Sequence, residues 1–141
     1  MAQPIERVLP EEAKARLDAG WAYVDVRAPE EFELGHPPGA YNVPLADAGG
    51  RPNSRFLSAI GAAIAVDVPV VVGCGVGVKS GRAAELLSAR GYRVAELSTG
   101  FDGLRDPFGT IVDLGWKRRG LPVEEGDGGD RGWGALARAI G

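Results

Sequence analysis

The sequence predicts one α/β domain in which a central parallel sheet is flanked by helices on both sides. Segments with strand character alternate with segments of helical periodicity, an order typical of parallel strands joined by crossover helices. Residues 68–72 (VPVVV) form an uninterrupted apolar run, as in a strand that is buried on both faces. The length of 141 residues, with 45% hydrophobic and 25% charged residues, fits a single domain with a real core.

The N-terminal part supplies one helix, one strand and a turn-rich loop. Residues Pro10–Ala19 begin with proline and acids and stop before Gly20, which are the signals of a helix start and end. Residues Ala22–Arg27 are short and partly β-branched, which indicates a strand. We expect at most one helical turn over Glu30–Leu34, followed by a loop over Gly35–Pro44.

The central part repeats the alternation of helix and strand. Apolar positions over Phe56–Val66 have the spacing of one helical face, and the apolar strand at 68–72 follows them. Residues Ser80–Arg90 then predict a second helix, and Tyr92–Leu97 predict the next strand. The sheet would therefore receive strands whose carboxyl ends meet at one edge.

The C-terminal end has a different composition. Residues 126–132 (GDGGDRG) predict a flexible tether, and Trp133–Ile140 predict a short terminal helix that either docks on the domain or extends from it. We assign residues 1–123 to the α/β domain and residues 124–141 to this tether with its short helix or tail.

The stretch 68–82 (VPVVVGCGVGVKSGR) resembles a phosphate-binding loop but departs from every such motif. The GxxxxGK[ST] motif requires glycine where Val78 stands, and the dinucleotide fingerprint GxGxxG requires glycine at Ser80. A phosphatase loop would place arginine at position 80, whereas Arg82 comes two residues later. The sequence thus does not predict a nucleotide-binding loop here.

The chain's one cysteine, Cys74, lies in this stretch at the carboxyl end of the apolar strand. Open sheets place active sites at that edge, and the start of the following helix directs partial positive charge at the loop. Such surroundings favour a reactive thiolate. We expect backbone N–H groups to surround the sulfur, namely those of Gly75, Val76, Gly77, Val78, Lys79 and Ser80.

Four segments resemble, in order, the rhodanese-like sulfurtransferases. They are DVRAPEEF (25–32), GHPPGAYNVP (35–44), CGVGVKS (74–80) and GWKRRGLPV (115–123), and the resemblance spans Arg7–Val123. It implies a rhodanese-like fold and a catalytic Cys74 that carries a persulfide within a six-residue loop, residues 74–79. The sequence departs from the family at Gly75 and Lys79, and it carries an insertion over Gly103–Leu114 that is a candidate for the rim of the site.

Several charged residues are candidates for supporting this site. Asp25 and Arg27 lie two residues apart on one strand and share a face, which indicates a structural ion pair that braces the loop. His36 stands among turn residues, so we expect structural hydrogen bonds from it. Lys79 and Arg82 sit at a helix start that disfavours cations, which indicates an anionic substrate.

The predicted activity is the transfer of sulfane sulfur from thiosulfate or a related donor to a thiophilic acceptor through a Cys74 persulfide. Without a second cysteine, the acceptor must be an external small molecule or protein. Two other functions stay open at this point: a sulfur-carrier or interaction module with little turnover, and a cysteine-dependent phosphatase.

Other classes of function receive no support from the sequence. A net charge of −3 argues against nucleic-acid binding, and the most apolar window, Ala59–Val78, is interrupted by Asp67 and Pro69, which argues against membrane insertion. The N-terminus lacks the layout of a signal peptide, so we expect a cytoplasmic protein. No cofactor and no metal site is predicted.

Overall fold

A five-stranded parallel sheet forms the centre of the computed structural model, which describes residues 5–47, 49–75 and 80–141. The strand order is β1-β5-β4-β2-β3, and every neighbouring pair is parallel. The strands are β1 (Glu6–Val8), β2 (Ala22–Asp25), β3 (Tyr41–Asn42), β4 (Val70–Gly73) and β5 (Val94–Leu97). The predicted parallel sheet is confirmed, with the apolar strand β4 at its centre.

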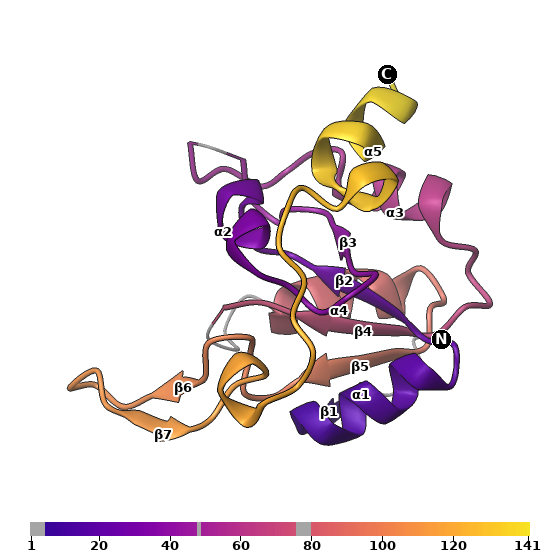
Figure 1. The fold of residues 1–141 in the computed structure, drawn as a ribbon. Coiled ribbons are helices and arrows are strands. Elements are labelled where there is room, and N and C mark those ends of the chain that lie inside the picture. Colours follow the sequence, from indigo (N-terminus) through magenta and orange to yellow (C-terminus); the bar gives the residue numbers. More distant parts are fainter. Residues whose placement is uncertain (1–4, 48, 76–79) are drawn as a thin grey trace.

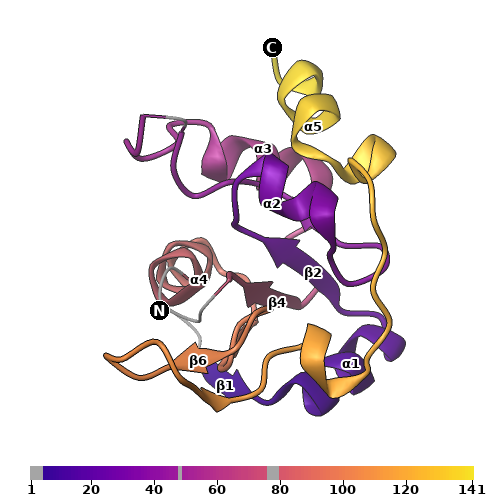
Figure 2. The same cartoon turned by 60° about the vertical axis from the view of Figure 1, so that its left-hand side comes forward.

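Helices cover both faces of the sheet, as the sequence predicts (Figures 1 and 2). One hydrophobic cluster packs one face against α3, α4 and α5, and it includes Phe56, Leu87 and Leu136. A second cluster packs the other face against α1, and it includes Ala13 and Trp116. The helices are α1 (Pro10–Asp18), α2 (Pro29–Leu34), α3 (Phe56–Ala63), α4 (Ser80–Ala89) and α5 (Trp133–Ala139).

Two strands of the sheet escape the sequence analysis because they are short and sit at the sheet's edges. β1 pairs with β5 over three residues, and β3 pairs with β2 inside the segment expected to be a loop. Two predicted strands also begin two residues later than expected, namely β4, which begins at Val70, and β5, which begins at Val94. The amide of Tyr92 donates to Leu87 O at 3.2 Å and so belongs to the end of α4, which leaves β5 to begin at Val94.

The insertion 103–114 forms an antiparallel hairpin of β6 (Leu104–Arg105) and β7 (Ile111–Asp113). Figure 1 shows this hairpin extending from the body of the domain, beyond the sheet. A short 3-10 helix, η1 (Lys117–Arg119), follows it. Arg119 holds η1 in place, because its guanidinium donates to Asp113 at 2.7 Å and to Glu11 at 2.8 Å.

The C-terminal segment docks on the domain. Its backbone pairs with the loop after α2, where the amide of His36 donates to Glu124 O at 2.9 Å and that of Glu124 donates to His36 O at 2.8 Å. Residues Gly129–Arg131 form a second 3-10 helix, η2, and α5 then buries Leu136 in the cluster that contains α3. The glycine-rich stretch predicted to be a tether therefore crosses the domain in contact with it (Figure 1).

Candidate active site

Cys74 directly follows the central strand β4 and exposes only 2% of its surface. Its carbonyl oxygen accepts the Phe101 amide at 2.7 Å, and the carbonyl of Gly75 accepts the Asp102 amide at 2.7 Å. The segment after β5 thus fastens the backbone on the carboxyl side of β4. This fixes the thiol at the carboxyl edge of the sheet, where the sequence predicts the site.

The glycine before the cysteine is required by the packing beneath the loop. A Cβ atom at Gly73 would collide with the side-chain oxygen of Tyr23, which comes from the neighbouring strand β2. The Tyr23 hydroxyl is buried and has no hydrogen-bond partner within the described part of the chain. Burial, together with the charge of Asp25, raises the pKa of Tyr23 well above its ordinary value of 10.0.

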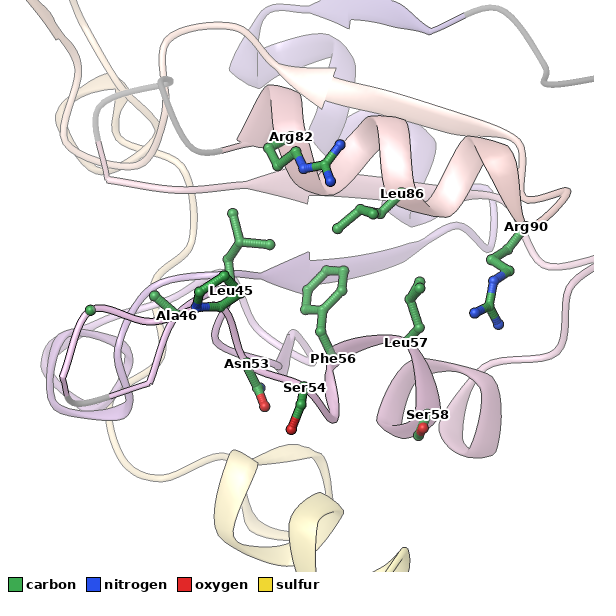
Figure 3. A pocket seen from close by; sticks show the side chains of 12 residues that line it. Leu45, Ala46, Asn53, Ser54, Phe56, Leu57, Ser58, Arg82, Leu86 and Arg90 are labelled. Carbon is green, nitrogen blue, oxygen red and sulfur yellow. The ribbon is translucent and has the colours of Figure 1, made fainter.

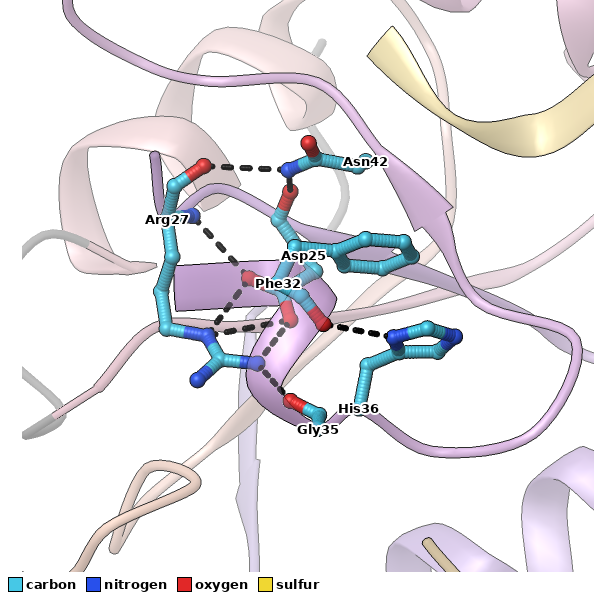
Figure 4. Close-up of polar contacts among 6 residues, drawn as sticks. All are labelled: Asp25, Arg27, Phe32, Gly35, His36 and Asn42. Atoms are coloured by element: carbon cyan, nitrogen blue, oxygen red, sulfur yellow. Dashed lines mark hydrogen bonds and ion pairs between the residues drawn. The ribbon is translucent and has the colours of Figure 1, made fainter. Parts of the chain in front are cut away.

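Asp25 and Arg27 form the expected ion pair at the end of β2 (Figure 4). The guanidinium donates to both carboxylate oxygens, with Nη2 at 2.7 Å and Nε at 3.0 Å, and Nη2 also donates to Gly35 O at 2.6 Å. Both side chains are buried. Burial disfavours the charge of Arg27, but the hydrogen bonds and charge of Asp25 outweigh it and raise the pKa of Arg27.

Further contacts tie this ion pair to its surroundings. The Arg27 guanidinium lies over the Phe101 ring, 4.4 Å from its centroid, and Phe101 is the residue whose amide binds Cys74 O. Asn42 donates to the carbonyls of Asp25 at 3.1 Å and Arg27 at 3.0 Å. We call Asp25, Arg27, Gly35 and Asn42 the bracing network. It connects the end of β2 to the segment that clamps the cysteine.

His36 makes structural contacts, as the sequence predicts. Its ring Nδ1 lies 2.7 Å from Phe32 O, a hydrogen bond drawn in Figure 4, and the ring stacks flat on Phe32 with centroids 3.6 Å apart. Its backbone pairs with Glu124 of the C-terminal segment. These contacts fix the loop that presents Gly35 O to Arg27.

The predicted loop residues divide into a described and an undescribed part. Val76, Gly77, Val78 and Lys79 lie outside the described residues, so the N–H cradle and the role of Lys79 stay predictions. Ser80 begins α4, is fully buried, and donates its hydroxyl to Glu96 Oε1 at 2.9 Å. This hydrogen bond fastens the start of α4 to β5. Glu96 is not among the residues predicted from the sequence to lie near the site.

Arg82, expected to bind substrate, occupies a different setting. Its side chain is 66% exposed and lies 3.7 Å from Glu85 on the same helix. With Leu86 and Arg90 it lines a groove between α4 and α3 (Figure 3). Its described contacts are therefore with this groove and with Glu85.

Charged side chains from several parts of the chain surround the Cys74–Gly75 segment. A Cβ atom at Gly75 would lie 3.1 Å from Asp102 Oδ2 and 3.9 Å from Glu31 Oε2, so two carboxylates approach the loop. Asp102 also lines a recess of about 280 Å³ together with Arg105, Lys117 and Arg118. We call these four residues the basic recess. These residues come from the segment after β5, from the insertion and from η1, and tertiary folding brings them together near Gly75.

The described residues show no helix long and apolar enough to cross a membrane. They also contain no cluster of three or more His, Cys, Asp or Glu side chains that would hold a metal ion.

Comparisons with known proteins agree with this arrangement. The chain is 35% identical to thiosulfate sulfurtransferase 16 of Arabidopsis thaliana, over 77% of this chain and 83% of that protein. It is 30% identical to thiosulfate sulfurtransferase GlpE of Haemophilus influenzae, over 86% of this chain and 96% of that protein. It is also 35% identical to senescence-associated protein DIN1 of Raphanus sativus, but covers only 57% of that longer protein.

The fold has solved counterparts as well. The crystal structure of Rv0390 from M. tuberculosis superimposes with a TM-score of 0.74 at 28% identity, over 86% of this chain and 98% of that one. Alr3790 from Anabaena sp. shares the fold with a TM-score of 0.65 at 19% identity, over 94% of this chain and 88% of that one. The model of the rhodanese-like domain matches residues 9–106, and the chain belongs to the rhodanese-like domain family.

Proposed function

We propose that the protein is a thiosulfate sulfurtransferase of the rhodanese type, which carries sulfane sulfur as a persulfide on Cys74. The observation that supports this most directly is the position of Cys74. It stands at the carboxyl end of the central strand, clamped by the 101–102 segment, just before the start of α4. α4 begins six residues after this thiol, and a helix start close to a cysteine favours a reactive thiolate and an anionic sulfur compound.

The reaction has two balanced steps. The Cys74 thiolate attacks the outer sulfur of thiosulfate, the bond between the two thiosulfate sulfurs breaks, and sulfite leaves with the bonding electrons. The persulfide anion then remains on Cys74. In the second step an acceptor such as cyanide or a small thiol attacks the outer sulfur and regenerates the thiolate.

The basic recess supports an anionic donor. Arg105, Lys117 and Arg118 outnumber the single carboxylate of Asp102, and all three cations are exposed. At about 4 Å, one cation attracts a unit negative charge by roughly 4 kcal/mol at an effective dielectric of 20, before desolvation is subtracted. Solvent and salt reduce this attraction for exposed side chains. The recess would therefore concentrate the donor more than hold it tightly.

A second function, a sulfur-carrier module with little thiosulfate turnover, also has an observation in its favour. The carboxylates of Asp102 and Glu31 approach Gly75, the residue next to the nucleophile, and would repel a dianionic donor there. Cys74 itself is nearly inaccessible, with 2% exposure. The balance between these carboxylates and the recess cations decides between the enzyme and the carrier.

We propose a cytoplasmic setting for this chemistry, since the chain has a single cysteine and no internal disulfide to form. Two of the similar plant proteins carry names that place them in the chloroplast.

Intact mass spectrometry after treatment with thiosulfate tests the proposal. We expect the mass to rise by one sulfur atom, cyanide to reverse the gain with release of thiocyanate, and Cys74→Ser to show neither change. Loading without catalytic thiocyanate production would identify a sulfur carrier. Phosphate release from an aryl phosphate without sulfur loading would identify a phosphatase and contradict the proposal.

A further inference from the structure

A groove between α3 and α4 is separate from the described contacts of Cys74. Its volume is about 550 Å³, within the range of pockets that hold small organic ligands. Figure 3 shows Phe56 and Leu57 of α3 facing Leu86 of α4 across it, with Leu45 at one end. These four residues form an apolar floor of which only Phe56 is fully buried.

One wall of the groove is a loop held in place by its own hydrogen bonds. The amide of Asn53 donates to Leu45 O at 2.9 Å, and its side chain donates to Pro44 O at 2.8 Å. Ala46 and Pro52 form a β-bridge, which closes the base of the loop. The wall is thus built before any ligand arrives, which lowers the ordering cost of binding.

The opposite wall carries positive charge. Arg82 and Arg90 flank Leu86 on the α4 side, roughly 12 Å apart along the helix axis at 1.5 Å per residue (Figure 3). Among the described residues that line the groove, none is an aspartate or a glutamate. Glu85 lies 3.7 Å from Arg82, but this exposed contact is weak and its carboxylate is outside the groove.

We propose that this groove binds a small organic anion with an apolar body. The body would cover the exposed parts of Leu45, Leu57 and Leu86, and the anionic group would pair with Arg82 on α4 and with Arg90, which directly follows α4. An apolar floor gives affinity through the area it removes from water, and an arginine fork selects a carboxylate, sulfonate or phosphate at its edge. The proposal stands independently of the sulfurtransferase activity.

Binding of two matched aromatic compounds tests the proposal. We expect naphthalenesulfonate to bind the wild-type protein at one saturable site, and the uncharged naphthalenemethanol to bind about tenfold more weakly. An amide NMR titration should place the shifts among residues 45–58 and 82–90. Equal affinity for the two compounds, or shifts confined to other parts of the chain, would overturn the proposal.

Two pairs of substitutions separate specific pairing from general charge. Arg82→Gln with Arg90→Gln should weaken naphthalenesulfonate about tenfold and leave naphthalenemethanol unchanged. Arg7→Gln with Arg93→Gln removes the same charge from two residues that do not line the groove. Arg93 is 62% exposed and 3.7 Å from Glu6, as Arg82 is 66% exposed and 3.7 Å from Glu85. If both double variants lost the same affinity for naphthalenesulfonate, the effect would come from net charge alone, and this result would contradict a specific site in the groove.

A floor variant completes the test. Leu57 is half-buried, and Leu57→Gln replaces it with a polar side chain of similar size. We expect this variant to bind both compounds several-fold more weakly. Circular dichroism should show that its fold is retained. Unchanged binding would contradict the assignment of the floor. Sedimentation of the wild-type protein tests whether a second copy of the chain occupies the groove instead. If the protein is a dimer and Leu57→Gln dissociates it, the groove is an interface between two copies and the proposal is overturned.

Discussion

The bracing network and the basic recess both adjoin the cysteine, yet they are built in opposite ways. In the bracing network the Asp25–Arg27 pair is buried, bidentate and shared with Gly35 O. In the recess Arg105, Lys117 and Arg118 are exposed, and none has a carboxylate within 4.0 Å among the residues the structure describes. Buried, mutually satisfied charges hold a backbone in place, whereas exposed charges meet molecules from solution.

The neighbouring Arg119 shows that the difference comes from tertiary contacts, not from residue type. It belongs to the same run of three cations as Lys117 and Arg118, but its guanidinium is taken by Glu11, Asp113 and the carbonyl of Leu114. Arg119 therefore fastens η1, and its two neighbours are left to face the recess. Four variants, at buried and at exposed positions, test this contrast between buried and exposed polar groups.

Asp25→Ala should have the largest effect, on stability. It leaves the buried Arg27 charge without its main partner, which costs about 3 to 5 kcal/mol of unfolding free energy. Urea unfolding at neutral pH measures this. An unchanged midpoint accompanied by loss of sulfur loading would make Asp25 a group of the reaction and break the contrast.

Tyr23→Phe should alter the pH dependence of stability. The pKa of Tyr23 is raised in the folded state, so its contribution is complete below pH 10 and is lost above it, where only the unfolded chain readily ionises. We expect the wild type to lose about 1 kcal/mol more than the variant between pH 10 and pH 11, because the unfolded tyrosine is already half ionised at pH 10.

Urea unfolding at both pH values checks the effect of Tyr23→Phe. Tyr92→Phe serves as a comparison, because the Tyr92 hydroxyl donates to Ile64 O at 2.6 Å and its removal should already cost stability at pH 8. Burial raises the pKa of Tyr92 as well, so this variant should also lose part of the pH dependence. Parallel pH profiles for the wild type and Tyr23→Phe would contradict the expectation.

Lys117→Gln with Arg118→Gln should change kinetics and leave stability alone. We expect KM for thiosulfate to rise about threefold at low salt, the size expected for exposed charge pairs, and the difference to shrink as salt is added. An uncharged polysulfide donor should be unaffected. If KM stays constant while the melting temperature falls, the recess is structural after all.

Arg82→Ala should have the smallest effect on the free energy of unfolding, within about 0.5 kcal/mol, because the side chain is exposed and its contact with Glu85 is weak. Thermal unfolding of Arg82→Ala and Asp25→Ala under the same conditions compares the smallest and the largest expected change in stability. A large loss of stability in Arg82→Ala would show that its charge supports the fold.

The fold class and the position of Cys74 could be predicted because they depend on local patterns of the sequence. The apolar run before Cys74 reflects the burial of β4, and the helical periodicity after Ser80 reflects the burial of one face of α4. Both patterns can be found in the sequence without knowing which elements β4 and α4 pack against. The Asp25–Arg27 pair was predicted from a shared strand face, and the pair is present, but β2 ends at Asp25 and Arg27 lies in the bend after it, where its amide also donates to Asp25 Oδ1 at 3.0 Å. Short edge strands such as β1 and β3 could not be found, because pairing over two or three residues leaves no periodic signal.

By itself, then, the sequence determined a parallel α/β domain with its one thiol at the carboxyl edge of the central strand. Only the tertiary structure decided which charges surround that thiol. Glu31 belongs to α2, Asp102 and Arg105 follow β5, and Lys117 and Arg118 belong to η1, and the folded chain brings these segments to the same edge. It likewise turned Arg82 toward the groove with Leu86 and Arg90. Local sequence sets periodicity and burial, but the surroundings of a charge depend on contacts between segments that are distant along the chain.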